Sequence, residues 1–312
     1  MDFHLTTPVA FFIFNRPNAT LKVFEIIRDA KPQKLFVVAD GARFSGEESK
    51  CKEARSIIEK IDWDCEVLTN FSDVNLGCKL RVSSGLDWVF DHVESAIILE
   101  DDCLPEPSFF EFCSELLTRY ANDRRVMMIS GDNFCLGKQR THHSYYFSRY
   151  INIWGWGTWK RAWQCYDVEM KLWNEIKSGS WLIDILLDPR IAEYWSDNFQ
   201  KTYDGKVDTW DYQWVFACWI NSGYSIVPNY NLVSNIGFGN DSSHTKYKKS
   251  KSNAMPTKSI IFPLNHPSFM IQDTISDRFL QKEFFDLKFL PLMRRQLKRI
   301  YLSLIRKISI IN

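Results

Sequence analysis

Short apolar runs alternate with segments of helical spacing along the first third of the chain. The runs 9–14 and 35–39 are apolar throughout instead of alternating with polar residues, which is typical of strands buried on both faces. Strands alternating with helices predict an α/β fold, with a mostly parallel sheet and helices on both faces. The predicted strands span 9–14, 35–39, 65–68 and 95–99, and the predicted helices span 21–30, 47–61 and 75–90.

Polar residues stand directly after three of these runs. Asn15 and Arg16 follow the first, Asp40 follows the second, and residues 100–102 follow the fourth. Sheets of this kind bind ligands beyond the carboxyl ends of their strands, where the loops of neighbouring strands meet. We therefore expect these polar residues to line a single crevice.

The middle of the chain changes character. Residues 144–219 are dense with Trp and Tyr, and a helix over 208–221 leads to a strand over 225–228. Residues 246–253 are basic and polar, which is typical of a surface loop.

The composition excludes several classes of protein. Of 312 residues, 45% are hydrophobic and 25% charged, which are values of a globular protein. A net charge of +1 gives no electrostatic basis for binding nucleic acid. The eight cysteines lack metal-finger spacing, which indicates reduced thiols of a cytoplasmic protein. We expect no signal peptide and no membrane-spanning helix, because no apolar run approaches about 20 residues.

The strongest chemical signal is the acidic triplet Glu100-Asp101-Asp102 at the end of a predicted buried strand. Three adjacent carboxylates repel one another there and favour a bound cation. Hard divalent ions such as Mn²⁺ and Mg²⁺ prefer carboxylate and phosphate oxygens. Because side chains alternate along an extended segment, Glu100 and Asp102 should point one way and Asp101 the other. A solvated acidic turn is the alternative, and the buried strand before the triplet argues against it.

The order of these motifs resembles the core of GT-A glycosyltransferases. The likeness runs from about Pro8 to Thr245, and includes the Golgi N-acetylglucosaminyltransferase that starts hybrid and complex N-glycans. The chain is also similar to family 2-like bacterial transferases of surface-polysaccharide gene clusters. The resemblance implies a GT-A (Rossmann-like) sheet. The segments that carry it are Asn75-Leu76-Gly77, the helix that follows, Ala96 to Asp102 and Pro105 to Phe110.

The resemblance assigns the acidic triplet to the variant DXD motif of this family. It implies that Asp102 ligates Mn²⁺ or Mg²⁺ and that Glu100 and Asp101 face the ribose and sugar of the donor. Further residues are implied to contact the nucleotide: Asn15 and Arg16 after the first strand, Asp40 as the acid that reads uracil, and Arg81 where the family has His.

A second group of chemical residues surrounds the start of the helix predicted over 208–221. An inverting transferase needs a carboxylate to accept the proton of the attacking hydroxyl. Asp211 lies between aromatic residues that would desolvate it, and the family places its base in a similar Trp-Asp pair. Asp208 is the second candidate for the base. The alternative is that either residue only caps the helix.

Two further segments are candidates for contacts with the donor. In Trp154-Gly-Trp-Gly-Thr-Trp159, glycines between indoles let backbone and rings approach a sugar, so Trp156 is predicted to contact the donor. Packing of Trp154 and Trp156 in the core is the alternative. His244 lies in a segment where these enzymes place a loop that closes over the donor phosphates, although a lone His is often only a surface residue.

The sequence therefore predicts a metal-dependent, inverting hexosyl- or N-acetylhexosaminyltransferase that uses a UDP-sugar. The expected acceptor is a glycan or lipid-linked glycan of bacterial surface polysaccharide, such as O-antigen, capsule or lipooligosaccharide. A sugar nucleotidyltransferase is the nearest alternative, but residues 15–18 are not its Gly-rich phosphate loop. A non-catalytic carbohydrate-binding protein would explain the aromatic residues and not the acidic triplet.

These patterns predict one domain in two halves and a tail. Residues 1–135 form the nucleotide-sugar-binding half, and residues 136–245 form the acceptor-binding half with the catalytic base. A flexible loop and packing segment follows at 246–288, and a basic amphipathic helix at 289–312.

The tail carries six basic residues and no acid between Phe289 and Asn312. Apolar residues recur there at helical spacing, so the helix should lie flat on an anionic membrane surface. This predicts a peripheral protein on the cytoplasmic face of the cell membrane. The alternative is that the apolar stripe packs on the catalytic domain or on a second subunit of a homodimer.

Overall fold

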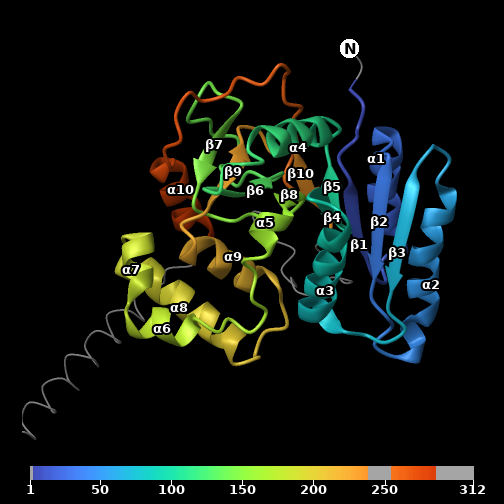
Figure 1. Ribbon diagram of the computed structural model, residues 1–312, viewed down its shortest axis with the longest axis horizontal. Helices are drawn as coiled ribbons and strands as arrows, with labels where there is room; N and C mark the ends of the chain where they lie inside the picture. The colour runs from blue at the N-terminus through green and yellow to red at the C-terminus, as the bar shows by residue number, and fades with distance from the viewer. Residues whose placement is uncertain (1–2, 238–253, 286–312) are drawn as a thin grey trace, which may run out of the picture.

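The computed structural model describes residues 3–237 and 254–285, and its centre is one eight-stranded sheet (Figure 1). The strand order is β3-β2-β1-β4-β8-β6-β9-β7, and β8 and β7 run against the other six strands. The predicted mostly parallel sheet is therefore confirmed. The strands are β1 (Val9–Ile13), β2 (Lys34–Ala39), β3 (Glu66–Phe71), β4 (Ser95–Glu100), β6 (Val126–Ser130), β7 (Tyr145–Ser148), β8 (Trp156–Trp159) and β9 (Tyr224–Pro228).

A two-stranded antiparallel ribbon stands next to the end of β4. It pairs β5 (Cys103–Pro105), which follows the acidic triplet, with β10 (Val233–Asn235), which lies far along the chain. The ribbon holds the residues after β10 against the acidic triplet, since the amide of Ile236 donates to the carbonyl of Asp102 at 2.8 Å.

Helices cover both faces of the sheet, as predicted (Figure 1). Successive residues of β1 pack into two different hydrophobic cores, because side chains alternate along a strand. Ala10 and Phe12 join α3, α5 and α9 in one core, and Phe11 and Ile13 join α1 and α4 in the other. The helices are α1 (Pro17–Ala30), α2 (Glu48–Ser56), α3 (Gly77–His92), α4 (Ser108–Arg119), α5 (Lys160–Trp163), α6 (Trp173–Ser178), α7 (Trp181–Leu186), α8 (Pro189–Tyr203), α9 (Asp211–Ile220) and α10 (Thr274–Phe284).

Local sequence explains where several helices begin. Pro17 is the first residue of α1, where its fixed φ and missing N–H have no cost. Asp188 precedes Pro189 at the start of α8, and its carboxylate accepts from the amide of Arg190 at 2.9 Å. Because α1 begins at Pro17, the turn between β1 and α1 is only three residues long, and it includes Arg16.

The strands differ in how deeply they are buried. The strand predicted over 65–68 is present as β3, and it is an edge strand of the sheet. Its Val67 and Phe71 are 37% and 36% exposed. The residues of this segment alone do not reveal that no strand follows on one side.

The Trp-rich segment is mostly a core element. Trp156 in β8 is fully buried and stacks on Trp210, with ring centroids 5.5 Å apart and planes at 17°. Trp163 and Trp214 contact the same ring. The core packing that the sequence left open for Trp156 is the arrangement that the structure has.

Some predictions concern residues outside the described ranges. The basic amphipathic helix at 289–312 and His244 are among them. Within residues 3–237 and 254–285, no helix is long and apolar enough to cross a membrane.

Because Trp156 is buried among other rings, we expect Trp156→Ala to destabilise the fold by about 3–5 kcal/mol, the usual cost of removing a buried Trp. Urea denaturation followed by circular dichroism measures this loss. Trp181→Ala is the control, since Trp181 is 53% exposed, and it should change stability by less than about 1 kcal/mol. Equal losses for the two variants would contradict the core role of Trp156.

Candidate functional site

A cavity of about 610 Å³ lies at the carboxyl ends of β1, β2 and β4. The first residues of α3 and α9 close it on the other side. Most of the polar residues predicted to share one crevice line it, namely Arg16, Asp40, Glu100, Asp101 and Asp102. The other candidates Arg81, Asp208 and Asp211 line the same cavity.

The acidic triplet lies at the centre of this cavity wall. Glu100 is the last residue of β4, and the two aspartates turn away from the sheet after it. Asp101 is 1% exposed, and its carboxylate accepts from the amide of Phe14 at 3.1 Å. That bond ties the end of β1 to the end of β4.

Arg16 is the cation that neutralises the two aspartates. Its Nη1 donates to Oδ2 of Asp102 at 2.6 Å, and its Nη2 donates to Oδ1 of Asp101. Gly237 lies against the same pair, and a Cβ there would be 2.1 Å from Oδ2 of Asp102. Only glycine leaves room for the ion pair at this position.

Burial shapes the protonation of the triplet. Desolvation, reinforced by the negative charge of Asp102, raises the pKa of Glu100 to about 8. Desolvation also raises the pKa of Asp101 to about 6, although Arg16 opposes this rise. Burial alone would lower the pKa of Arg16, but the two aspartates raise it above its ordinary value. Glu100 is the member of the triplet with the least compensation for its charge.

Asp40 holds a turn that forms another wall of the cavity. Its Oδ1 accepts from the amides of Gly41 and Leu76, each at 2.9 Å. Its Oδ2 accepts from the side chain of Asn75 at 2.9 Å and from the amide of Gly77 at 3.1 Å. With both oxygens engaged in this way, the carboxylate determines the shape of the wall.

The predicted Arg81 and Asn15 occupy different places. Arg81 is buried beside the cavity, where desolvation lowers its pKa, and its Nη2 donates to Asn70 at 3.0 Å. Asn15 is not among the lining residues and donates to Glu47 at 2.9 Å. Glu47 also pairs with Arg43, which does line the cavity.

The two candidate bases have different surroundings. The carboxylate of Asp208 accepts from the amides of Cys78 and Lys79, each at 3.0 Å, and so caps α3 from a distant loop. Asp211 is the first residue of α9, and the hydroxyl of Thr209 donates to its Oδ1. Both line the cavity, but only Asp208 serves the N-terminus of another helix.

Trp154 and Trp156, the two tryptophans considered for sugar contacts, lie in different surroundings. Trp154 lines the cavity, whereas Trp156 does not and packs in the core. Tyr212 and Arg43 also line it and were not predicted from the sequence. Arg43 follows the Asp40-Gly41 turn by two residues, and a cation this close to a strand end is a signal for the cavity.

No three His, Cys, Asp or Glu side chains within residues 3–237 and 254–285 are grouped so as to hold a metal ion by themselves. Glu100 and Asp102 nevertheless offer carboxylate oxygens on the cavity wall. Mg²⁺ is often bound by one or two carboxylates together with the phosphates of a substrate. The residues therefore fit a metal that binds with a phosphate ligand and not a preformed protein site.

Comparisons with known proteins identify no family. No family model and no curated protein matches the chain. Among solved structures, the chain is similar to a cytidylyltransferase from Leptospira borgpetersenii, with 11% identity over 52% of this chain and 63% of that chain, and a TM-score of 0.33.

Two structures of UDP-glucose pyrophosphorylase are also similar. The complex with UDP-glucose has 13% identity over 46% of this chain and 62% of that chain, with a TM-score of 0.26. The apo form has 10% identity over 72% and 93%, with a TM-score of 0.36. This chain thus spans less than two thirds of the cytidylyltransferase and of the UDP-glucose complex.

Arg16 should be required for stability, because removing one partner of a buried charge cluster leaves the other charges uncompensated. We expect Arg16→Met to lower the free energy of unfolding by about 3 kcal/mol in metal-free buffer, as measured by urea denaturation. Arg190→Met is the matched control. Arg190 is half-exposed beside Asp188, whose side chain is 27% exposed, so its loss should cost less than about 1 kcal/mol. An Arg16→Met protein as stable as the wild type would show that Arg16 does not neutralise the aspartates.

Proposed function

We propose that the chain is a GT-A-type, inverting glycosyltransferase that moves a sugar from a nucleotide diphosphate sugar, preferably a UDP-sugar, to a glycan acceptor. One observation carries this proposal. The cavity at the carboxyl ends of the parallel strands has Glu100 and Asp102 on one wall and Asp211 at the start of α9. Cation-binding carboxylates and a separate base are the two kinds of group that such a transfer needs.

The cavity has the size and charges for a nucleotide diphosphate. Its volume of about 610 Å³ is in the range of small-molecule sites. Arg16, Arg43 and Arg81 are the cations in its described lining, and guanidinium groups suit phosphate oxygens. Since both oxygens of Asp40 already accept hydrogen bonds, we assign Asp40 to shaping the nucleoside wall through Asn75.

Asp102 would hold the divalent metal, Mn²⁺ or Mg²⁺, together with the diphosphate of the donor, and Glu100 and Asp101 would lie next to the ribose and sugar. When bound, the metal offsets the negative charge that grows on the leaving diphosphate. For Asp102 to be available, Arg16 would exchange its bond to Asp102 for one to a phosphate oxygen. Arg16 would therefore neutralise the aspartates before the donor binds and the diphosphate of the donor afterwards.

Asp211 is proposed as the base. Its carboxylate accepts the proton of the acceptor hydroxyl as the new bond between that oxygen and the anomeric carbon forms. The bond between the anomeric carbon and the phosphate oxygen breaks at the same time, and the nucleoside diphosphate leaves with the electron pair. Attack from the side opposite the leaving group inverts the anomeric centre. Asp208 is not assigned this role, because it caps α3.

The acceptor is proposed to be a growing bacterial surface glycan attached to a lipid. Trp154 and Tyr212 are aromatic side chains on the cavity wall against which a sugar face could stack. We further propose that the protein works on the cytoplasmic face of the membrane, with the basic segment 289–312 as its anchor.

A sugar nucleotidyltransferase would act on similar molecules, and the structure argues against it at one point. Its Gly-rich phosphate loop would follow the first strand, but only Phe14, Asn15 and Arg16 separate β1 from Pro17 of α1. Incubation with a panel of nucleotide sugars and Mn²⁺ distinguishes the two activities. Release of a nucleoside diphosphate supports a glycosyltransferase, and pyrophosphate-dependent formation of a nucleoside triphosphate supports a nucleotidyltransferase.

Mn²⁺ and UDP should bind cooperatively, because the described residues supply too few ligands for the metal alone. Isothermal titration calorimetry should show weak binding of Mn²⁺ by itself and UDP binding at least about tenfold tighter with Mn²⁺ than with EDTA. Asp102→Asn should remove this enhancement and the turnover while the protein stays folded. Tight Mn²⁺ binding without UDP, or metal-independent turnover by Asp102→Asn, would contradict the proposed metal site.

The roles of Asp211 and Asp208 can be separated by measuring both turnover and stability. Asp211→Asn should lower kcat about 10²-fold or more and leave UDP affinity unchanged, since general-base catalysis contributes about that much. Asp208→Ala should instead lower the free energy of unfolding by about 1 kcal/mol through loss of the α3 cap. If Asp208→Ala loses kcat and Asp211→Asn does not, the base has been assigned to the wrong residue.

A further inference from the structure

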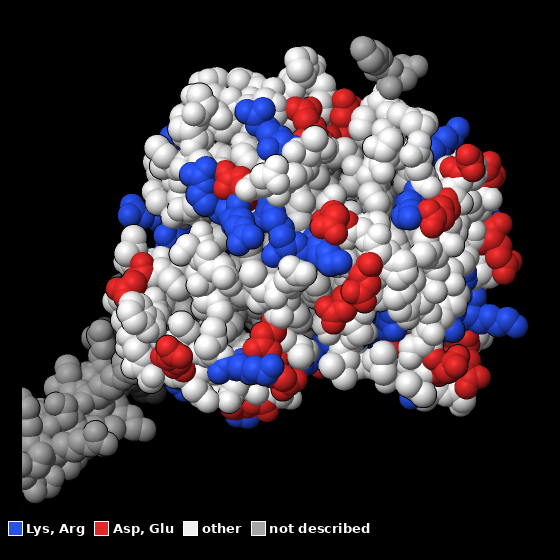
Figure 2. Space-filling model, viewed as in Figure 1, with Lys and Arg blue, Asp and Glu red and all other residues white. Residues whose placement is uncertain are grey.

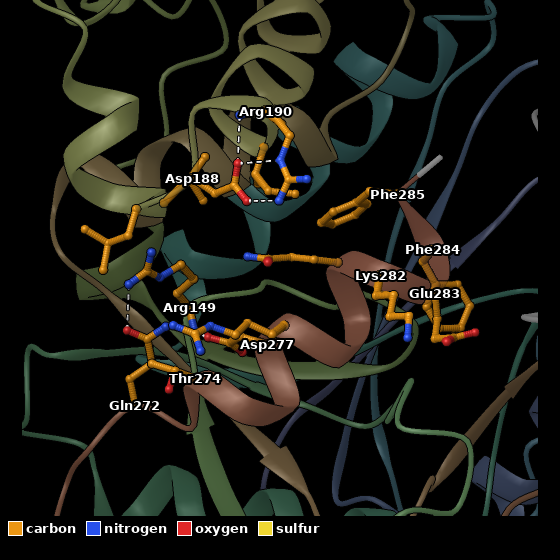
Figure 3. Close-up of a pocket in the computed structure, with 15 residues that line it drawn as sticks. Arg149, Asp188, Arg190, Gln272, Thr274, Asp277, Lys282, Glu283, Phe284 and Phe285 are labelled. Atoms are coloured by element: carbon orange, nitrogen blue, oxygen red, sulfur yellow. Dashed lines mark hydrogen bonds and ion pairs between the residues drawn. The ribbon is translucent and has the colours of Figure 1, made fainter. Parts of the chain in front are cut away.

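A second cavity of about 960 Å³ lies between α8 and α10, beside the end of β7 (Figure 3). It has no lining residue in common with the first cavity. Figure 3 shows Arg149 and Gln272 on one side of the opening, Arg190 and Asp188 across from them, and α10 with Lys282 along a third side. None of these residues belongs to the proposed transfer reaction.

The lining of this second cavity is more cationic than a count of charges suggests. Its aspartates already have partners. Asp188 forms a two-pronged ion pair with Arg190, with Oδ2 and Nη2 2.6 Å apart. Asp277 is 3% exposed and accepts from the side chains of Ser148 and Gln272.

Three cations remain for a ligand. Arg149 donates to the neutral oxygen of Gln272 at 2.7 Å; Asp277 lies near enough to attract its charge, but the two side chains form no ion pair. Arg278 and Lys282 lie on α10 one turn apart, are exposed, and form no ion pair with another described residue. Guanidinium and ammonium groups converging on one cavity favour an anion such as phosphate.

The other part of the lining is apolar. Leu186, Ile191, Phe284 and Phe285 contribute to it, together with Leu187, which is 74% exposed. On neighbouring α7, Trp181 and Ile183 are 53% and 43% exposed. The exposed side chain of Leu187 beside the apolar lining residues suits an apolar part of a ligand. The cavity therefore suits a molecule with an anionic group and an apolar chain.

The two cavities are linked by aromatic contacts. The ring centroid of Phe134 lies 5.1 Å from that of Trp154 and 5.1 Å from that of Phe284. Trp154 lines the first cavity and Phe284 lines the second. The chain also passes from Arg149 to Trp154 in five residues, at most about 18 Å when fully extended. One elongated molecule could therefore contact both cavities.

From this arrangement, we propose that the second cavity binds the phosphate of a lipid-linked acceptor, with the chain of the lipid along Leu187 and α7. The part of this assignment that concerns the acceptor rests on the proposed glycosyltransferase function. The segment 289–312 of the same chain is not the occupant that charge favours, because it carries six basic residues and no acid. Its charge repels the cavity and attracts the same anionic lipids.

Decyl phosphate, at concentrations where it forms no micelles, is a soluble probe for this cavity. Isothermal titration calorimetry with the full chain should show that decyl phosphate binds more tightly than decanol, inorganic phosphate or glucose 1-phosphate. Arg149→Gln and Lys282→Gln should each weaken it about tenfold, the effect of one lost charge-assisted hydrogen bond. Arg124→Gln, an exposed arginine outside both cavities, is the matched control and should bind as the wild type does.

The outcomes separate this inference from the proposed function, because UDP binding is measured on the same variants. Loss of decyl phosphate binding in Arg149→Gln and Lys282→Gln with UDP binding intact supports the cavity. Equal binding of decanol, equal binding of glucose 1-phosphate, or unchanged binding in both variants overturns it. If the protein binds decyl phosphate but not UDP, the anion site is supported and the proposed transferase function is overturned. Lys282 is exposed, so its variant tests the cavity even if Arg149→Gln is unstable.

Discussion

The structure depends most on the compensation of the carboxylates that β4 carries to the edge of the sheet. Asp101 is buried there because its neighbours on β1 and β4 leave it no access to water, and Asp102 is mostly covered. Arg16 offsets both charges, and the amide of Phe14 supplies a further hydrogen bond to Asp101. This arrangement holds the ends of the two central strands in register with the first turn of α1.

Asp40 and Asp208, two other carboxylates of this cavity, hold the start of α3 in place. Asp40 fixes the turn before α3, and Asp208 caps the first amides of that helix. Both therefore place the start of α3 on the cavity wall. A carboxylate with all its acceptor positions engaged is a poor base, whereas burial leaves Glu100 with a raised pKa and little compensation from the groups around it. Asp40 and Asp208 thus hold the walls of the site, and Glu100 is the acid of the triplet whose charge is compensated least.

On the face of the molecule that Figure 2 shows, lysine and arginine side chains lie among acidic ones, with one basic run across the middle, so the charge of this face is mixed. The two cavities differ more clearly, because the lining of one includes the acidic triplet and the lining of the other includes Arg149, Arg278 and Lys282. The contacts of Phe134 join them. A transferase with an acidic transfer site and a cationic site for the far end of its acceptor would bind an elongated molecule in one orientation only.

The sequence by itself determined the parallel half of the sheet, because apolar runs of strand length between helical segments bury their surfaces best in a parallel sheet covered by helices. It also placed Arg16, Asp40 and the acidic triplet in one crevice, because strand ends in such a sheet converge. Only the tertiary structure decided that Trp156 is core, that β3 is an edge strand, and that Asp208 caps α3. It alone assembled the second cavity from β7, α8 and α10. The physical reason is that strand order and long-range contacts depend on which surfaces pack together, and the spacing of residues along one segment carries no information about its partners.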